Sequence, residues 1–320
     1  MAAPLRLAIV GTGSMGSLHA RVASQSDRVE LAYVVDSNRE NGEPVAGRFG
    51  AIWRAGLDGV DDIDAVIVAA ATGAHHELGR MVLERRLPML MEKPLADRLP
   101  DAEDLVQLSE KLDVPLMCGL LERFNPAIMT ALDVIEEPRH VTATRHSPYV
   151  ARIRTGVASD LLIHDIDIAL AMAGALPTAV RGSFGYLHPE SEPGSEDVAE
   201  AMLGFADGMV ANISASRLSQ RKVREFAIAE TNRLIEVDML RNAVTIYRHV
   251  LNEASPDGLS YKQQTIIEIP ALVSSREPLA AQLDRFVDLV RGTADVAQER
   301  ARILPAHQVV EQIRENASAI

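Results

Sequence analysis

The sequence predicts two domains: an α/β domain with a doubly wound parallel sheet over residues 1–121, and an α+β domain with a large, mostly antiparallel open sheet over residues 122–320. Three observations support this prediction. Short apolar strands alternate with helical patterns up to about residue 119. A glycine-rich turn follows the first of these strands. Beyond residue 126, several β-rich segments follow one another without intervening helices, which is typical of antiparallel pairing.

The composition limits the classes of partner. Of the 320 residues, 47% are hydrophobic and 24% are charged, which is enough apolar material for a globular core. The net charge of −13 argues against a nucleic acid or an anionic membrane surface as partner, since either requires a basic surface. Apolar runs such as residues 65–71 are too short to span a bilayer.

Cysteine usage and the start of the chain indicate the compartment. Cys118 is the single cysteine, which excludes an intramolecular disulfide and a cysteine-based zinc cluster. The first residues lead directly into a strand and leave no room for a secretory signal peptide. We therefore expect a cytoplasmic protein.

The first strand and its turn carry the strongest motif. The strand at residues 5–10 runs into Gly11-Thr12-Gly13-Ser14-Met15-Gly16, where a helical pattern begins. The next strand, at residues 31–35, ends at Asp36, twenty residues after Gly16. Strand, glycine turn, helix, strand and terminal acid in this order form the dinucleotide-binding fingerprint of a Rossmann domain.

Each part of this fingerprint has a physical task. Gly11 permits the tight turn, Gly13 lets the pyrophosphate approach the backbone, and Gly16 lets helix and strand pack closely. The helix N-terminus offers amide donors and partial positive charge to the phosphates. Asp36 would accept hydrogen bonds from the adenosine ribose and repel a 2′-phosphate, which favours NAD over NADP, whereas Arg39 would soften this discrimination.

Alternating strands and helices complete the first domain, with strands at residues 65–70, 89–91 and 114–119 and helices at residues 75–86 and 100–112. The strand at 89–91 breaks at Glu92-Lys93-Pro94, because proline cannot donate to the ladder and biases Lys93 towards an extended conformation. Lys93 thus lies at the C-terminal end of a strand, where open α/β sheets bind ligands. A solvated surface lysine is the alternative.

The pattern changes after Glu122-Arg123-Phe124-Asn125-Pro126. A helix is expected at residues 127–135, a strand at 140–145, and then a helix that carries residues 160–167. The remaining strands are expected at residues 180–187, 198–205, 209–216, 224–230, 234–239, 244–250 and 264–269, and two helices, at 278–291 and 305–317, close the chain. The cleft between the domains is the default place for a ligand.

Residues 160–167 read Asp-Leu-Leu-Ile-His-Asp-Ile-Asp. Helical residues four and seven apart fall on nearly the same face, which aligns Asp160, His164 and Asp167. A mostly apolar helix does not carry such a row without partners, because unpaired buried polar groups are costly. Two interpretations stay open on these residues alone: a hydrogen-bonded core histidine with a cap and a surface face, or a functional site.

Taken together, the glycine turn, Asp36, Glu92-Lys93-Pro94 and the spacing Asp160-x-x-x-His164 resemble the Gfo/Idh/MocA family of oxidoreductases, over essentially the whole chain. The resemblance implies a sugar- or cyclitol-type substrate, and a homodimer or homotetramer formed through the C-terminal sheet. It implies that Lys93, Asp160 and His164 line the substrate site beside the nicotinamide. The family resemblance extends the cofactor site beyond the glycine turn and Asp36 to Ala71, Thr72, His76, Glu92 and Lys93.

One departure concerns the cofactor site. The family usually has a Thr-Pro pair after the third strand, shortly before a histidine. If His75 and His76 set the register, this chain has Ala71-Thr72 there. The hydroxyl near the nicotinamide ribose is then displaced or lost, which affects the detail of cofactor binding but not binding itself.

Finer features resemble a subgroup that includes UDP-N-acetylglucosamine 3-dehydrogenases. They are the segment 122–126, Arg145-x-x-Pro148-Tyr149-x-x-Arg152-Ile153, and His164-Asp165-Ile166-Asp167. On this basis the predicted substrate-binding residues are Lys93, Arg123, Tyr149, Arg152, Asp160 and His164. Arg152 and Arg154 are candidates for binding a substrate diphosphate, with surface ion pairing as the alternative.

The chemistry expected of such a site is oxidation of a secondary alcohol. Histidine suits removal of the hydroxyl proton because imidazole titrates near working pH. We expect His164 to be the general base, Lys93 to stabilise the developing alkoxide charge, and Asp160 to hold substrate hydroxyls or orient the other two. Asp165 and Asp167 are expected to be structural.

Three rival functions remain. A zinc hydrolase would use His164 with Asp165 and the pair His75-His76, but neighbouring helical residues do not face one site, so no metal is expected. A catalytically silent relative that senses NAD or sugar would be marked by loss of Lys93 or His164, and both are present. An NAD-dependent redox glycosidase would oxidise, eliminate and re-reduce its substrate.

Overall fold

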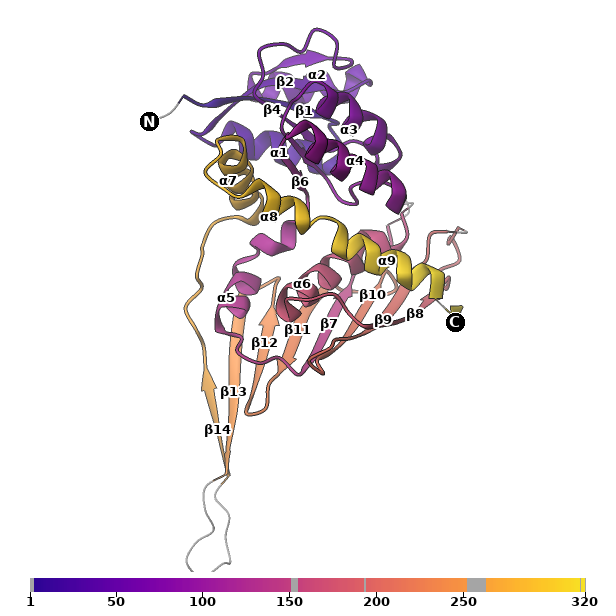
Figure 1. Ribbon diagram of the computed structural model, residues 1–320, viewed down its shortest axis with the longest axis vertical. Coiled ribbons are helices and arrows are strands. Elements are labelled where there is room, and N and C mark those ends of the chain that lie inside the picture. The colour runs from indigo at the N-terminus through magenta and orange to yellow at the C-terminus, as the bar shows by residue number, and fades with distance from the viewer. Residues whose placement is uncertain (1–2, 151–154, 193, 252–262, 317, 320) are drawn as a thin grey trace, which may run out of the picture. The chain divides into compact units, whose positions relative to one another are not determined.

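The computed structural model describes residues 3–150, 155–192, 194–251, 263–316 and 318–319. The chain divides into two compact units (Figure 1). The first unit consists of Met1–Leu121 and Glu277–His307, and the second of Glu122–Arg276 and Gln308–Ile320. The segment Glu277–His307 thus belongs to the same compact unit as the first 121 residues.

The first unit is a Rossmann domain with a six-stranded parallel sheet in the order β3-β2-β1-β4-β5-β6. Its strands are β1 (Leu5–Val10), β2 (Val29–Val35), β3 (Ile52–Arg54), β4 (Ala65–Val68), β5 (Met89–Met91) and β6 (Leu116–Cys118). Strands β4, β5 and β6 are apolar and fully buried, and β1 is so from Leu7 to Val10, as expected when helices cover both faces of a parallel sheet. The predicted fold class of this unit is confirmed.

The helices of the first unit come from both ends of the chain. They are α1 (Ser14–Ser24), α2 (Arg39–Phe49), α3 (His75–Glu84), α4 (Leu99–Leu112), α7 (Pro278–Val290) and α8 (Val296–Ala301), with a short 3₁₀ turn at Thr72–Ala74. Three elements, α2, β3 and α8, were not predicted from the sequence. Helix α2 buries only Gly42 and Ala46 and contains Pro44, so it shows little apolar periodicity.

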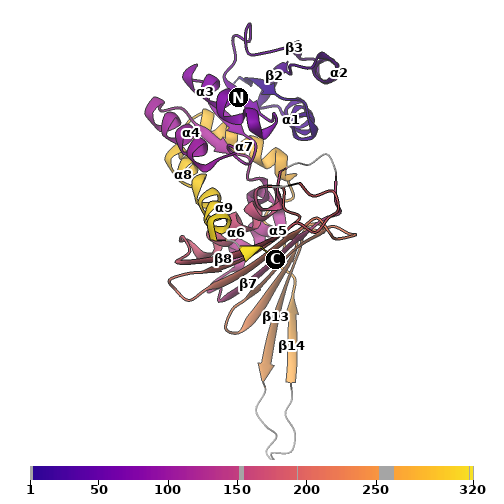
Figure 2. The same cartoon turned by 90° about the vertical axis from the view of Figure 1, so that its right-hand side faces the viewer.

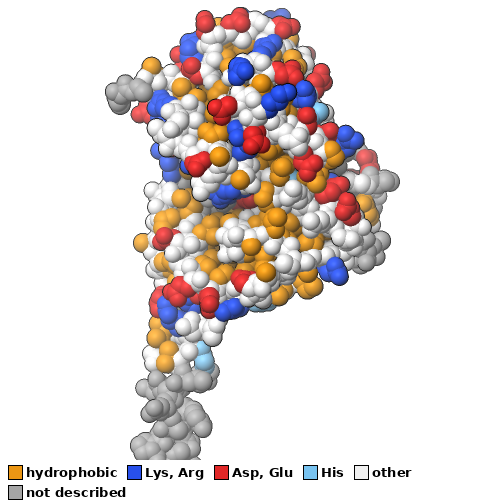
Figure 3. Space-filling model, viewed as in Figure 1, with side chains coloured by type: hydrophobic (Ala, Val, Ile, Leu, Met, Phe, Trp, Pro, Cys, Tyr) orange, Lys and Arg blue, Asp and Glu red, His pale blue; other side chains and the backbone are white. Residues whose placement is uncertain are grey.

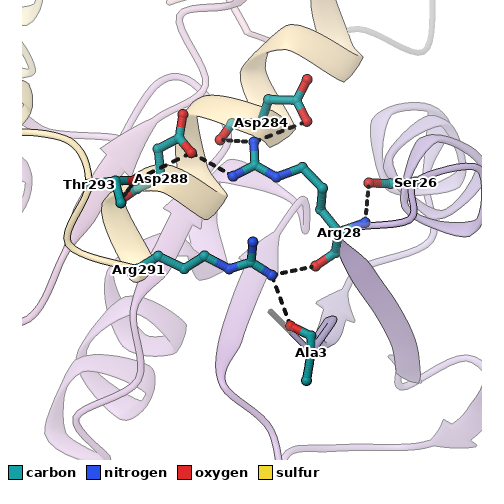
Figure 4. A network of polar contacts seen from close by, with 7 residues as sticks. All are labelled: Ala3, Ser26, Arg28, Asp284, Asp288, Arg291 and Thr293. Atoms are coloured by element: carbon teal, nitrogen blue, oxygen red, sulfur yellow. Dashed lines mark hydrogen bonds and ion pairs between the residues drawn. The ribbon is translucent and has the colours of Figure 1, made fainter. Parts of the chain in front are cut away.

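Helix α7 joins the first unit through an apolar face and a set of arginine contacts. Leu283, Phe286 and Val287 are buried. Arg28, just before β2, donates to the carboxylates of Asp284 (3.4 Å) and Asp288 (2.5 Å) on α7 (Figure 4). In the opposite direction, Arg291 donates to the backbone oxygens of Ala3 and Arg28. These interactions account for the return of the chain to the Rossmann domain.

The second unit is built on a nine-stranded, mostly antiparallel sheet in the order β14-β13-β12-β11-β7-β10-β9-β8-β15. Strand β7 pairs in parallel with β10, and β15 with β8. The strands are β7 (His140–His146), β8 (Ala179–Gly185), β9 (Val198–Gly204), β10 (Val210–Ser216), β11 (Val223–Ala229), β12 (Arg233–Asp238), β13 (Ala243–Leu251), β14 (Gln263–Glu268) and β15 (Ser318–Ala319).

Helices cover one face of this sheet (Figure 2). Helix α5 (Pro126–Val134) is capped by Asn125, whose side chain accepts from the Ala127 and Ile128 amides. A π-helical turn (Ala158–Leu162) leads into α6 (Ile163–Ala173). Helix α9 (Leu304–Asn316) contains the unit boundary, and its Ile313 packs against Gly182 of β8.

Among the described residues, no helix is both long and apolar enough to cross a bilayer. On the face drawn in Figure 3, acidic and basic side chains are interspersed over the first unit. This mixture of signs is the ordinary surface of a globular protein rather than a basic surface for polyanions.

Candidate functional site

The glycine turn of the first unit has the geometry that a dinucleotide requires. Gly11 has a φ of +89°, and a Cβ there would lie 2.6 Å from the backbone of Ala70. A Cβ on Gly16 would lie 1.9 Å from the Gly11 carbonyl oxygen. A Cβ on Gly13 would instead enter open space, with nothing within 4 Å. The turn is thus closed on its protein side and open where a pyrophosphate would approach.

The first turn of α1 supplies donors at this opening. Its N-cap is Gly13, so no side chain caps the first amides of the helix. Gly13 and Ser14 are exposed, Met15 is half-buried, and Thr12 is buried. Uncapped amides at a helix N-terminus bind anions well. The predicted residues 11–16 therefore fit the pyrophosphate of a dinucleotide.

Asp36, directly after β2, is held in place by neighbouring amides. Its Oδ2 accepts from the backbone N–H (2.9 Å) and the hydroxyl of Thr12, and its Oδ1 accepts from the Asn38 amide (2.9 Å). These contacts join the carboxylate to the glycine turn. A fixed carboxylate at this strand end suits two vicinal ribose hydroxyls and opposes a 2′-phosphate.

Arg39, the residue that would soften this preference, has an acidic partner on its own helix. Its Nε and Nη2 each donate to Glu43 at 2.9 Å, and the guanidinium lies 5.5 Å from the Trp53 ring centroid. The hydrogen bond with Glu43 raises the pKa of Arg39 and lowers that of Glu43. Glu43 therefore competes with any 2′-phosphate for this arginine.

Replacing Asp36 by asparagine is expected to weaken NADH binding by about tenfold or more, since a hydrogen bond to a charged group contributes roughly 1.5 kcal/mol or more. The preference over NADPH should shrink, because the charge that repels a 2′-phosphate is removed. Titration calorimetry with both nucleotides measures the two effects. Glu40→Gln, which removes an exposed acid in the first turn of α2, is the control. An unchanged NADH/NADPH affinity ratio in Asp36→Asn would contradict the assignment.

Three buried histidines hold the segment 92–95 around Lys93. His19 on α1 lies 2.8 Å from the Glu92 carboxylate, and both side chains are almost fully buried. His75 lies 2.9 Å from the Pro94 carbonyl oxygen, and His307 accepts from the Leu95 amide at 3.0 Å.

Glu92 is also constrained from other directions. Its Oε2 accepts from the Lys93 amide (3.3 Å), and a Cβ on Gly119 would lie 2.8 Å from that oxygen. The backbone of half-buried Lys93 is therefore fixed on both sides. The sequence analysis missed His19 and His307, although position 19 lies on the buried face of α1 with Gly16, Ala20 and Ala23.

The remaining predicted cofactor residues lie after β4. Ala71 is exposed and half-buried Thr72 begins the 3₁₀ turn. His76 lies 2.7 Å from Asp104 of α4, where His76 and then Arg80 hold the pKa of that carboxyl below its usual value. His75, rather than His76, makes the contacts with the strand ends, at Ala70 and Pro94.

The second unit holds the other candidate cluster, on the π-turn and the start of α6. Asp160 lies on the π-turn and receives a hydrogen bond from Arg217 at 2.8 Å. His164 follows in the first turn of α6 and is half-buried. Single π-turns are frequent at functional sites. The sequence analysis expected an ordinary helix through this stretch.

The aspartates that follow His164 are buried in ion pairs. Asp165 and Arg145 are each 1% exposed, and Arg145 donates to Asp165 (2.6 Å) and to Glu122 (2.6 Å). Burial alone would lower the pKa of Arg145, but the charges of Asp165 and Glu122 outweigh it and raise the pKa above its usual value. Asp167 pairs in a bidentate manner with Arg123. Asp160, His164 and Asp167 are aligned along the helix, and of these three Asp167 is buried in a structural ion pair.

Two of the predicted substrate residues have protein partners. The Arg123 side chain is only 9% exposed and uses two nitrogens for Asp167, as a structural ion pair does. Half-buried Tyr149 stacks on His188 with ring centroids 3.5 Å apart and donates to the Glu190 carbonyl at 3.2 Å. Arg152 and Arg154 lie outside the described residues. A role in substrate binding stays a prediction for all of them.

No group of three or more His, Cys, Asp and Glu side chains among the described residues could hold a metal ion. Cys118 is buried at the end of β6. The arrangement of the first unit, with its open glycine turn and anchored Asp36, defines a dinucleotide-binding Rossmann domain, and the class of protein is an NAD-binding oxidoreductase.

The chain belongs to the Gfo/Idh/MocA family. Residues 5–120 match the family model described as "Oxidoreductase family, NAD-binding Rossmann fold", and residues 130–236 match the "GFO/IDH/MocA C-terminal domain". The resemblance seen in the motifs is therefore confirmed, and so is NAD as the cofactor.

Individual relatives cover most of the chain. It is 26% identical to the UDP-N-acetylglucosamine 3-dehydrogenase of Acidithiobacillus ferrooxidans over 89% of this chain and 88% of that protein. A solved structure of that enzyme superposes with a TM-score of 0.83 at 25% identity, covering 99% of this chain and 98% of the other. An inositol 2-dehydrogenase of Rhizobium meliloti is 27% identical over 67% of this chain and 69% of that protein.

Proposed function

We propose that this protein is an NAD-dependent dehydrogenase that oxidises a secondary alcohol of a sugar, a nucleotide sugar or a cyclitol. The observation that carries the proposal is the contrast along residues 160–167. Asp165 and Asp167 are buried in ion pairs with arginines, whereas Asp160 and His164 remain half-buried. Two polar side chains that remain partly accessible beside buried neighbours can reach a substrate.

Nucleotide sugars are the first substrate class to test. The relative named as a UDP-N-acetylglucosamine 3-dehydrogenase matches nearly the full chain, whereas the inositol dehydrogenase named above matches two thirds of it. An anionic diphosphate would suit the predicted Arg152, and a KM that does not depend on salt concentration would count against this contact.

The chemistry assigns one task to each residue. The glycine turn and Asp36 would hold NAD, whose nicotinamide supplies the hydride acceptor for oxidation of the alcohol carbon. His164 would take the hydroxyl proton, and would return it in the reverse direction. Lys93, on its anchored strand end, would donate a hydrogen bond to the reacting oxygen and stabilise negative charge there. Asp160 would bind substrate hydroxyls and so position the reacting carbon relative to His164 and Lys93.

A screen of nucleotide sugars, cyclitols and sugar phosphates for NADH absorbance tests the proposal. We expect NADH formation with at least one sugar-type compound that carries a secondary alcohol. Release of a sugar without net NADH would instead identify a redox glycosidase. Tight binding of NAD and a sugar with no turnover would identify a sensor of the same fold.

We also propose a homodimer or homotetramer formed through the nine-stranded sheet, in a reducing cytoplasm. Helices α5 and α6 lie on one side of that sheet (Figure 2). Strand β9 alternates buried and exposed side chains, and Met202 is 46% exposed. An uncovered apolar side chain on a broad sheet favours association with a second copy. Light scattering should give two or four times the chain mass, and a monomer would contradict this proposal.

A further inference from the structure

Arg217 is a buried arginine that the sequence analysis did not single out. It follows the last residue of β10, and its side chain is 2% exposed. Its Nη2 donates to the Asp160 carboxylate at 2.8 Å and to the Thr155 carbonyl oxygen at 2.6 Å. Its own backbone amide donates to the Asp197 carbonyl at 2.8 Å. The backbone of Arg217 is therefore anchored, and its guanidinium joins Asp160 to Thr155, three residues before the π-turn.

A buried guanidinium requires such partners. Desolvation of a charge is costly, and it is offset only when a carboxylate and further acceptors lie at hydrogen-bonding distance. Here the carboxylate is that of Asp160, whose side chain is 22% exposed. The Arg224 charge also acts on this carboxylate. Arg217 donates a charge-assisted hydrogen bond to Oδ2, and such a bond favours one orientation of the carboxylate.

The backbone around Asp160 is held from a second direction. Glu196, just before β9, accepts from the Ala158 amide at 2.9 Å, and its carbonyl accepts from the Val157 amide at 3.0 Å. A Cβ on Gly156 would lie 2.1 Å from the Glu196 carboxylate, so a larger residue would displace it. Glu196 thus holds the backbone at the entry to the π-turn, and Arg217 holds the Asp160 side chain.

We propose that Arg217 is a positioning residue that holds the Asp160 carboxylate in the orientation needed at the substrate site. The inference rests on the proposed function, in which Asp160 binds substrate hydroxyls. It assigns a role in turnover to a residue that the family motifs of the sequence do not include.

Arg233 offers a matched control for the test. It is also a buried arginine of the second unit, and it also pairs with a buried carboxylate, Glu230, and donates to one backbone carbonyl, that of Val134 (2.7 Å); exposed Glu136 lies 3.2 Å away as a second, solvated partner. Arg217→Met and Arg233→Met therefore remove chemically similar interactions. Comparable losses in Tm are expected from the two substitutions.

Activity should separate them. We expect Arg217→Met to lower kcat/KM by about 10- to 100-fold per folded enzyme, with both kcat and KM affected, because a misplaced substrate contact reduces turnover steeply. NADH affinity should change by less than about twofold, since the cofactor contacts belong to the other unit. Arg217→Lys should recover part of the loss, because the ammonium keeps the charge beside Asp160. Equal specific activity in Arg217→Met and Arg233→Met would overturn the proposal.

Crystal structures of the same variants test, without a substrate, whether Arg217 orients the Asp160 carboxylate. In Arg217→Met the Asp160 carboxylate should rotate away from its wild-type orientation, while in Arg233→Met it should not. An unmoved Asp160 carboxylate in Arg217→Met would overturn the positioning role. Failure of the wild type to reduce NAD with any sugar would instead refute the proposed function, and the two failures are thereby distinguished.

Discussion

Replacement of His164 by alanine is expected to lower kcat by about 10²- to 10⁴-fold, the usual contribution of a positioned general acid or base. The proton of the substrate hydroxyl would then lose its proposed acceptor, the imidazole of His164. NADH binding should survive, because the glycine turn and Asp36 belong to the first unit and His164 to the second. Steady-state NADH formation measures the loss, and calorimetric titration of NADH measures the retained affinity.

A matched control is His140→Ala, which removes an exposed histidine at the start of β7 that contacts only Asn212 in the described hydrogen-bond network. It should retain turnover within about twofold. Lys93→Met, compared with Lys111→Met on the last turn of α4, tests the lysine in the same way. Near-normal turnover in His164→Ala would exclude it as the general base. Loss of NADH binding together with turnover would indicate a folding defect.

Replacement of Asp165 by alanine is expected to destabilise the second unit by about 3–5 kcal/mol, the cost of removing one partner from a buried ion pair. Arg145 would keep Glu122 (2.6 Å) but lose the carboxylate that binds both its Nε and its Nη2. A guanidinium that is 1% exposed has no water to replace this partner. Urea unfolding followed by far-UV circular dichroism measures the change.

The double variant Arg145→Met/Asp165→Leu separates the charge effect from packing. It removes both charges and fills the space with apolar side chains, so it should recover most of the lost stability. Arg241→Met, which breaks an exposed pair with Asp238, is the control and should have little effect. If the double variant were as unstable as Asp165→Ala, packing rather than the unpaired charge would account for the loss.

The elements that could be predicted from the sequence are those whose buried residues form an apolar run or a periodic apolar pattern. Strand β4 and residues 7–10 of β1 are apolar runs, and the glycine turn with Asp36 has a fixed spacing, so the Rossmann fold could be predicted from local pattern. Helix α2 was missed although Asn38 caps it and Gly50, with a φ of +74°, ends it. Its caps are local signals that the apolar pattern did not support.

The partners of the site residues could not be predicted, because they come from distant segments. His19 and Glu92 are 73 positions apart, and Arg217 lies 57 positions from Asp160. Nothing in the local sequence of Arg217 distinguishes it from a surface arginine. Asp165 and Asp167 were expected to be structural. Their ion-pair partners, Arg145 and Arg123, are known only from the structure.

The Rossmann domain of this protein has a consequence for synthesis on the ribosome. Its last helices, α7 and α8, lie in Glu277–His307, after the whole nine-stranded sheet except β15. At about 5–20 residues per second, residues 122–307 take roughly 10–40 s to follow residue 121. During that interval the surface that later receives Phe286 has no covering helix. We therefore expect the nascent N-terminal domain to depend on chaperones until α7 has left the exit tunnel.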